Sequence, residues 1–163
     1  MGNNMSKPLL AVTMGDPAGV GAEIVVKTFA NAHIFDHAQP FVIGSVACLK
    51  QAVEQTGVSV DIEAVESAAE VKQGKSIQVF EPFSFDISTL RIGEVSAFCG
   101  DAAVQFFETA VRLCQDDTVQ GVVTCPINKE AVHAAGYHGD IGHQEILARM
   151  TGSELTATML MTR

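Results

Sequence analysis

The chain has 163 residues, enough for one domain or for one lobe of a larger protein. Its formal charge is −9, from 19 acidic and 10 basic residues, which excludes a face for DNA or RNA because such a face needs positive charge. Apolar residues make up 47% of the chain and charged residues 18%. The charged share lies below the ~25% of an average soluble domain, so we expect a folded chain with much buried surface.

No apolar stretch approaches the ~18 residues needed to span a bilayer. The first residues, 1–6, lack the basic and hydrophobic regions of a secretion signal. We therefore expect a cytoplasmic protein with no membrane partner, and a disordered N-terminus over residues 1–7. The four cysteines have no Cys-x-x-Cys spacing, which favours reduced, buried thiols over a zinc site.

The first predicted unit is a strand, a tight loop and a helix. Apolar residues 9–13 predict the strand, and glycines and a proline at 15–19 predict the loop. In the helix that follows, Ile24, Val25 and Phe29 recur at helical spacing and are expected to share one face.

The pattern then repeats, with further strands expected at residues 40–44, 58–62 and 76–80. Ser45 is a favourable N-cap for a helix that we expect to end at Gly57. The acidic stretch 63–74 has no clear apolar period and is expected to cross the surface.

Residues 93–115 predict one long helix packed on a sheet, because apolar residues recur at steps of three and four; Gly100 inside it should cost some stability. The strand expected at 118–123 is almost entirely apolar, as in a parallel sheet covered on both faces. The remaining predicted elements are helices at 130–135 and 142–151 and a last strand at 155–161. The alternation of strands and helices predicts an α/β fold with a mostly parallel sheet.

The sequence ends at Thr162 and Arg163, directly after the last predicted strand. A buried strand rarely ends a domain in this way, so we interpret residues 1–163 as the N-terminal portion of a longer α/β protein. An edge strand at a natural end of the chain is the alternative.

Two predicted strands are followed by loops with residues suited to ligands, and open α/β sheets bind ligands at the carboxyl ends of their strands. The first loop contains Gly15 and Asp16. Glycines there permit close backbone approach, and the start of the following helix favours an anion. The loop has neither the Gly-Lys-Ser/Thr of a Walker loop nor the G-x-G-x-x-G of a dinucleotide site. A tight turn without a ligand explains it equally well.

The second loop follows the strand expected at 118–123 and contains Thr124, Asn128 and Lys129. The amide could orient a polar substrate, and the ammonium could pair with a phosphate or a carboxylate. A solvent-exposed lysine without a ligand is the alternative.

A third cluster, His143 and Gln144, begins the helix expected at 142–151. An imidazole and an amide beside exposed backbone N–H groups suit an anionic group. Helix capping, with Glu145 favoured in the first turn by the helix dipole, is the competing interpretation. None of the five histidines has a cysteine or carboxylate at a convincing metal-ligand spacing, and no G-x-S-x-G elbow indicates a hydrolase.

Three segments, in this order, resemble the signatures of the 4-hydroxythreonine-4-phosphate dehydrogenase family of pyridoxal phosphate biosynthesis: residues 13–24 (TMGDPAGVGAEI), 123–130 (VTCPINKE) and 142–145 (GHQE). The resemblance covers nearly all of this chain but only about the first half of a family member. It implies an isocitrate/isopropylmalate-dehydrogenase-like α/β/α fold, truncated here, and a homodimer with the active site at the subunit boundary.

The resemblance also implies NAD-dependent oxidation, with decarboxylation, of 4-phosphohydroxy-L-threonine or a related phosphorylated four-carbon hydroxy acid. In the family, three histidines hold a divalent metal (Zn, Mg or Co) that polarises the reacting oxygen. No histidine of this chain matches them, so we assign no metal ligand here. His143 matches the histidine that contacts the substrate near its phosphate. Gln144 stands where the family usually has threonine, which leaves the exact substrate open.

Two other functions remain open at this point. An acyl-phosphate transferase of the same broad fold would need coenzyme A and would not bind nicotinamide. A non-catalytic phosphometabolite-binding module would be stabilised by its ligand without turnover. If the dehydrogenase interpretation is right, residues 1–163 lack the metal ligands and should show no turnover alone.

Overall fold

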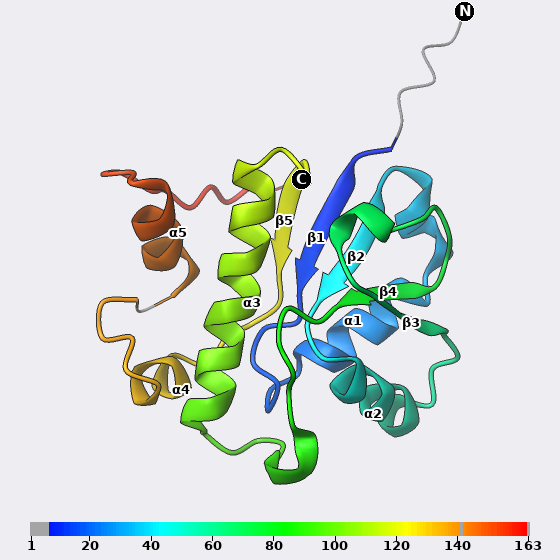
Figure 1. Cartoon of the computed structure of the whole chain (residues 1–163), viewed down its shortest axis with the longest axis horizontal. Helices are drawn as coiled ribbons and strands as arrows, with labels where there is room; N and C mark the ends of the chain where they lie inside the picture. The colour runs from blue at the N-terminus through cyan, green and yellow to red at the C-terminus, as the bar shows by residue number, and fades with distance from the viewer. Residues whose placement is uncertain (1–6, 141, 163) are drawn as a thin grey trace, which may run out of the picture.

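The computed structural model describes residues 7–140 and 142–162, which form a five-stranded sheet with helices on both faces (Figure 1). The strands are β1 (Leu9–Thr13), β2 (Gln39–Ile43), β3 (Ile62–Val65), β4 (Ile77–Phe80) and β5 (Gly121–Thr124). Their order is β3-β4-β2-β1-β5, and every neighbouring pair is parallel. The predicted α/β fold is confirmed. We expected residues 1–7 to be disordered. Of these, residues 1–6 lie outside the described part of the chain.

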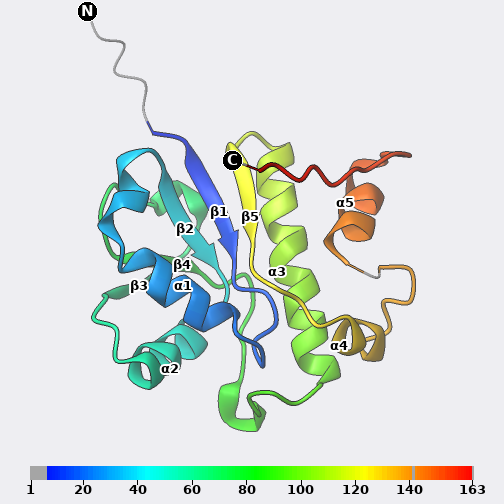
Figure 2. The ribbon, with the colours of Figure 1, turned by 180° about the vertical axis from the view of Figure 1, so that it is seen from behind.

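The helices are α1 (Gly21–Phe29), α2 (Val46–Thr56), α3 (Ala97–Gln115), α4 (Lys129–Ala134) and α5 (His143–Thr151). Short 3-10 turns lie at Ala32–Asp36, Ala68–Glu70 and Ile87–Thr89. Helices α1 and α2 cover one face of the sheet and α3 covers the other, while α4 and α5 pack against α3 (Figures 1 and 2). No helix in the described ranges combines the length and apolarity that a bilayer crossing requires.

The ends of α2 follow directly from its sequence. The hydroxyl of Ser45 accepts a hydrogen bond from the backbone N–H of Cys48, and Gly57 ends the helix in the left-handed conformation with φ +67°. Helix α1 differs slightly from its prediction. Val25 and Phe29 are buried as expected, but Ile24 is 42% exposed because the buried face passes through Val26 instead.

Two predicted boundaries shift for identifiable reasons. Helix α3 begins at Ala97 rather than at residue 93, because Gly93 has φ +81° and donates its N–H to the carbonyl of Ala18 in the β1–α1 loop. The shift is larger for β3: the strand predicted at 58–62 shares only Ile62 with it, and the rest of β3, residues 63–65, lies in the stretch that we expected to cross the surface. Strand β3 lies at the edge of the sheet, so Glu63 can face solvent within the strand.

The strand predicted at 155–161 is wrong. This segment is extended but pairs with no strand of the described chain, and a strand forms only where a neighbour takes up its backbone hydrogen bonds. Its large apolar side chains, Leu155, Met159, Leu160 and Met161, are 82–89% exposed. The expected burial of β5 on both faces is also wrong: Gly121 and Val122 are half-buried and Val123 and Thr124 are exposed, because β5 lies at the edge of the described sheet.

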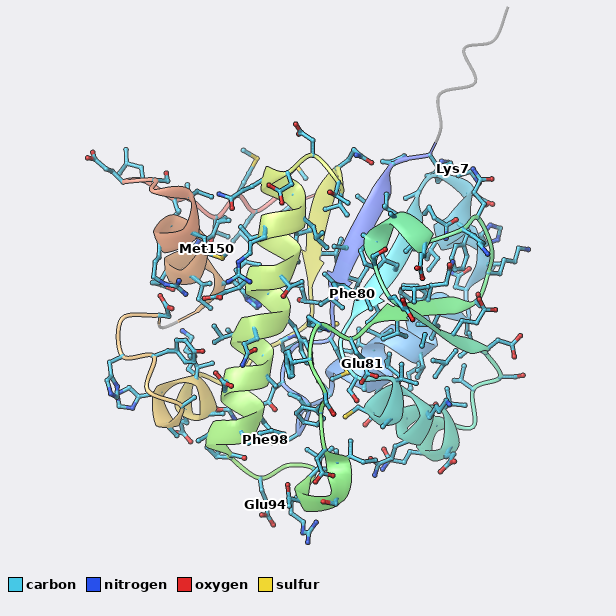
Figure 3. All side chains as sticks on the ribbon, in the orientation of Figure 1. Lys7, Phe80, Glu81, Glu94, Phe98 and Met150 are labelled. Atoms are coloured by element: carbon cyan, nitrogen blue, oxygen red, sulfur yellow. The ribbon has the colours of Figure 1, made fainter. Side chains whose placement is uncertain are left out.

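Helix α3 is buried on two faces. Its residues Ala102, Phe106 and Ala110 pack with the main core around the sheet. Its second face forms a separate cluster with α4 and α5, made of Val104, Phe107, Val111, Val132 and Ile146. Met150 of α5, labelled in Figure 3, packs against this second cluster. Helix α3 therefore connects the sheet to the two helices that follow β5.

Gly100 lies at a close contact between α3 and α4. A Cβ at this position would stand 2.1 Å from the carbonyl oxygen of Ala131 and 2.6 Å from the backbone nitrogen of Val132. Backbone atoms cannot yield as a flexible side chain can. Gly100, which the sequence predicts to lower helix stability, therefore allows α4 to pack on α3.

We expect Gly100→Ala to lower the free energy of unfolding by about 1–3 kcal/mol, because the added methyl overpacks the α3–α4 contact. Alanine is ordinarily the better helix former by ~1 kcal/mol, so the sign of the change is diagnostic. Urea unfolding monitored by circular dichroism measures it. Gly139→Ala is the control, since no atom lies within 4 Å of a Cβ there. An increase in stability for Gly100→Ala would contradict the packing argument.

Candidate functional site

The loops that follow β1 and β5 contact each other at the carboxyl edge of the sheet. The two strands are neighbours, with Thr13 opposite Thr124. Beyond the strands, the N–H of Cys125 donates to the carbonyl of Thr13 at 3.1 Å, and the N–H of Asp16 donates to the carbonyl of Pro126 at 3.1 Å. The first two predicted ligand loops therefore form one hydrogen-bonded unit.

The glycines of the first loop make this close contact possible. Gly15 has φ +74°, and a Cβ there would lie 2.3 Å from the carbonyl oxygen of Pro126. A Cβ on Gly21 would lie 1.9 Å from the carbonyl oxygen of Met14. Protein backbone already occupies the space beside both glycines, so this loop offers no open cradle for the pyrophosphate of a dinucleotide.

Asp16 is buried within the same unit and lines neither of the two hollows described below. Its Oδ1 accepts a hydrogen bond from the N–H of Ala18 at 2.8 Å, which fixes the turn into α1. Burial raises the pKa of Asp16, and the Ala18 hydrogen bond opposes that rise. Burial also raises the pKa of Cys125 to about 11, so this thiol is no nucleophile at neutral pH.

The residues of the second loop divide between structural and exposed positions. Asn128 is the N-cap of α4: its Oδ1 accepts hydrogen bonds from the N–H groups of Glu130 and Ala131, at 2.9 and 3.1 Å. The amide oxygen predicted to orient a substrate is therefore engaged by the helix. Lys129, the first residue of α4, is exposed, as is Thr124 at the end of β5.

His143 and Gln144, at the start of α5, line two adjacent hollows. The Lys129 hollow has a volume of about 490 Å³ and is completed by Pro126, Ile127, Lys129, Gly142, Glu145 and Thr158. The Phe107 hollow has a volume of about 440 Å³ and is completed by Phe107, Val111, Cys114, Gln115, Val122, Thr124, Leu147 and Thr151. The structure thus brings Lys129, His143 and Gln144 together and places Thr124 on the second hollow.

His143 has the environment of a neutral imidazole. Its ring packs edge-on against Phe107, with 4.8 Å between ring centroids. Its Nε2 is buried and has no hydrogen-bond partner among the described residues. Burial lowers the pKa of His143, so the uncharged ring dominates near pH 7.

The start of α5 also suits an anion, because no side chain of the described residues caps its first N–H groups. Lys129 adds a positive charge to the same hollow, and Glu145 adds a negative one. Gln144 is exposed, and its amide donates to the hydroxyl of Thr158 in the segment after α5. The longer side chain thus reaches the segment beyond the helix.

Phe107 was not among the predicted site residues. The apolar spacing of residues 93–115 predicts one buried face, which contains Phe106 and lies on the sheet, whereas Phe107 belongs to a second buried face. The signal was available, because Val104, Phe107 and Val111 repeat at helical spacing beside the first stripe.

Over residues 7–140 and 142–162, no three histidine, cysteine or carboxylate side chains converge as metal ligands. The first loop is likewise closed by backbone at Gly15 and Gly21. The described residues by themselves therefore fit neither a divalent metal nor a dinucleotide.

The parallel sheet, with helices on both faces and a hollow beyond its carboxyl edge, is the arrangement of an open α/β fold. A family model described as "Pyridoxal phosphate biosynthetic protein PdxA" matches residues 36–163, and the chain belongs to this family. The family resemblance seen in the sequence is therefore confirmed.

Relatives and solved structures agree with this assignment. The chain is 36% identical over 155 residues to a D-threonate 4-phosphate dehydrogenase of Cupriavidus necator, covering 94% of this chain and 46% of that protein. It resembles the crystal structure of a 4-hydroxythreonine-4-phosphate dehydrogenase from Burkholderia phymatum with a TM-score of 0.87 and 38% identity, covering 93% and 46% of the two chains. A terephthalate 1,2-cis-dihydrodiol dehydrogenase from Burkholderia xenovorans matches with a TM-score of 0.63 and 26% identity, covering 80% and 37%. The chain thus spans about half the length of the curated relatives that it matches.

We expect His143 to make folding stability depend on pH. The pKa of His143 is lower in the folded chain than in the unfolded chain. As pH falls below about 6.5, the unfolded state therefore binds a proton before the folded state does, which favours unfolding. Stability contributed by this group is complete above that pH and declines as the solution becomes acidic.

His143→Gln should flatten the decline of unfolding free energy with falling pH, measured by urea titrations across the acidic range. His37→Gln, an exposed position, is the control for loss of one imidazole. If the two variants changed the pH dependence equally, burial of His143 would not be its cause.

Proposed function

We propose that the chain forms the phosphate-binding wall of an NAD-dependent, metal-dependent dehydrogenase. Its substrate is 4-phosphohydroxy-L-threonine or a related phosphorylated four-carbon hydroxy acid, which it oxidises with decarboxylation in pyridoxal phosphate biosynthesis. The proposal includes the homodimer and the cytoplasmic location expected from the family resemblance. The relatives named above are dehydrogenases, two of them of threonine-derived phosphates, which favours this function over an acyl-phosphate transferase.

One observation carries the proposal: His143 and Gln144 begin a helix whose start has no described side-chain cap and lines the same hollow as Lys129. The N–H groups at the start of a helix bind anions because they lack intrahelical acceptors and carry the positive end of the dipole. Lys129 makes no ion pair with any described residue, so its ammonium is available to a phosphate. A phosphate placed here would meet both the N–H groups at the start of α5 and the ammonium of Lys129, with Glu145 the opposing charge in the lining.

The neutral imidazole of His143 contributes a hydrogen bond rather than a charge. Phe107 fixes its ring plane, and its buried Nε2 leaves Nδ1 as the atom able to serve a ligand. Gln144, with both a donor and an acceptor, selects among polar groups on the substrate. We propose that the longer glutamine in place of threonine shifts substrate preference within phosphorylated four-carbon acids.

The nicotinamide would accept the hydride, and the metal would stabilise negative charge on the oxidised oxygen. Both groups would be held by residues outside those described here. The part left to this chain is therefore to bind the phosphate end and orient the substrate.

Lys129→Gln should weaken binding of 4-phosphohydroxythreonine by roughly 10- to 150-fold, since a hydrogen bond to a charged group contributes ~1.5–3 kcal/mol. Isothermal titration of the purified chain measures the dissociation constant. Lys50→Gln removes the same charge from the exposed side of α2 and is the matched control. Equal weakening by both substitutions would mean that only net charge matters and that the Lys129 hollow is not the site.

Residues 1–163 should yield no steady NADH with substrate, NAD and Mg²⁺ or Zn²⁺. A chimera in which the remaining half of the Cupriavidus necator relative follows residue 163 should restore turnover. Sustained NADH formation by the chain alone would contradict the division of roles. Substrate-dependent stabilisation with no turnover by a folded chimera would favour the non-catalytic binding module instead.

A further inference from the structure

A cluster of four charged side chains joins α5 to α3. The Nη2 of Arg149 donates to Asp140 Oδ2 and to Glu108 Oε1, both at 2.7 Å, and its Nε donates to Asp140 Oδ2 at 3.0 Å. Glu108 also accepts a hydrogen bond from Arg112 Nη2 at 2.6 Å, one turn along α3. We call these residues, Glu108, Arg112, Asp140 and Arg149, the Arg149 cluster.

Within the cluster, Arg149 is the group that connects separate elements. Glu108 lies on α3, Asp140 lies in the connection between α4 and α5, and Arg149 lies in the last turn of α5. Arg112 contacts only its own helix. Removing Arg149 would therefore separate α5 from both carboxylates, whereas removing Arg112 would leave that link intact.

Burial makes the link to Arg149 strong. The side chain of Asp140 is 9% exposed and that of Glu108 is 15% exposed, whereas Arg149 itself is 48% exposed. A carboxylate withdrawn from water is costly unless a positive partner is held close to it. The two carboxylates consequently fix the guanidinium and, through it, the helix.

Two members of the cluster are close in sequence to the residues of the His143–Phe107 contact. Asp140 precedes His143 by three residues, and Glu108 follows Phe107, against which the His143 ring packs. Arg149 thus connects the chain just before the histidine to the chain just after its aromatic partner. A second connection, from the Tyr137 hydroxyl to Asp101 Oδ1 at 2.6 Å, anchors the same connection to α3 from further away.

We propose that Arg149 is a positioning residue: by bridging Asp140 and Glu108 it holds the start of α5 against Phe107 and so places His143 and the open helix N-terminus in the Lys129 hollow. The use of that placement for phosphate binding rests on the proposed function. The placement itself is independent of it. Arg149 is not a ligand for the phosphate, because its guanidinium is already directed at two protein carboxylates.

The test is nuclear magnetic resonance of the His143 ring in the purified 163-residue chain. The edge-on contact with Phe107 gives the ring protons a ring-current shift, and burial holds the pKa of His143 below its ordinary value. Arg149→Met should move those protons toward the positions of an exposed histidine and raise the pKa toward the ordinary value. Inorganic phosphate, titrated in the same samples, should bind about two- to thirtyfold more weakly. The amide spectrum of the sheet should stay unchanged.

Arg112→Met is the matched control, since it removes a guanidinium from the same Glu108 without detaching α5. The proposal predicts no change in the His143 resonances for this variant. An unchanged His143 ring in Arg149→Met, or an equal change in Arg112→Met, would overturn the proposal. If Arg149→Met does not fold, Arg149→Lys decides by the same criterion, because lysine keeps the charge but cannot make the paired contact with Asp140.

The two proposals fail in different ways. If phosphate does not bind the unaltered chain while the His143 ring moves in Arg149→Met, the positioning role stands and the proposed binding role fails. If phosphate binds the unaltered chain and the ring does not move, the positioning role fails.

Discussion

Burial of α3 on two faces is the constraint on which the rest of the structure depends. One face lies on the parallel sheet, and the other supports α4 and α5, so a single helix fixes both layers relative to each other. This arrangement demands close approach at one point, which Gly100 permits, and an aromatic surface at another, which Phe107 provides. Without the second face, the start of α5 would have nothing to pack against, and its histidine would be an ordinary exposed side chain.

The glycine-rich motifs act on the site indirectly. They carry the family resemblance, yet Gly15 lies against the backbone of Pro126 in the β5 loop and Gly21 against the carbonyl of Met14 in its own loop. Gly15 lets the β1 loop lie directly on the β5 loop. The hydrogen bond between these loops fixes the position of Pro126, shortly before the start of α4. Asn128 then caps α4 and leaves Lys129 at the edge of the hollow. Residues that look like ligand contacts in a sequence can thus be the packing that positions the contacts.

Local rules predicted most of the fold because they act within a few residues. Ser45 and Gly57 bound α2 through hydrogen bonds and backbone conformation that the sequence specifies alone. The failures are those that depend on distant partners. Residues 155–161 have the composition of a strand, but the described chain gives them no strand to pair with. The ion pairs of the Arg149 cluster could not be predicted from the sequence either, because α3, Asp140 and α5 meet only in the folded chain.

The charge of the chain makes local placement decisive for binding a phosphate. A net charge of −9 repels an anion, but exposed charges are largely screened beyond about 8 Å at physiological salt. The groups that line the Lys129 hollow then matter most: the ammonium of Lys129, the start of α5, an imidazole kept neutral by burial, and one opposing carboxylate, Glu145. The stronger cation nearby, Arg149, is neutralised by Asp140 and Glu108, so it contributes position rather than charge. An acidic α/β chain can therefore offer an anion site provided that its packing, rather than its composition, supplies the donors.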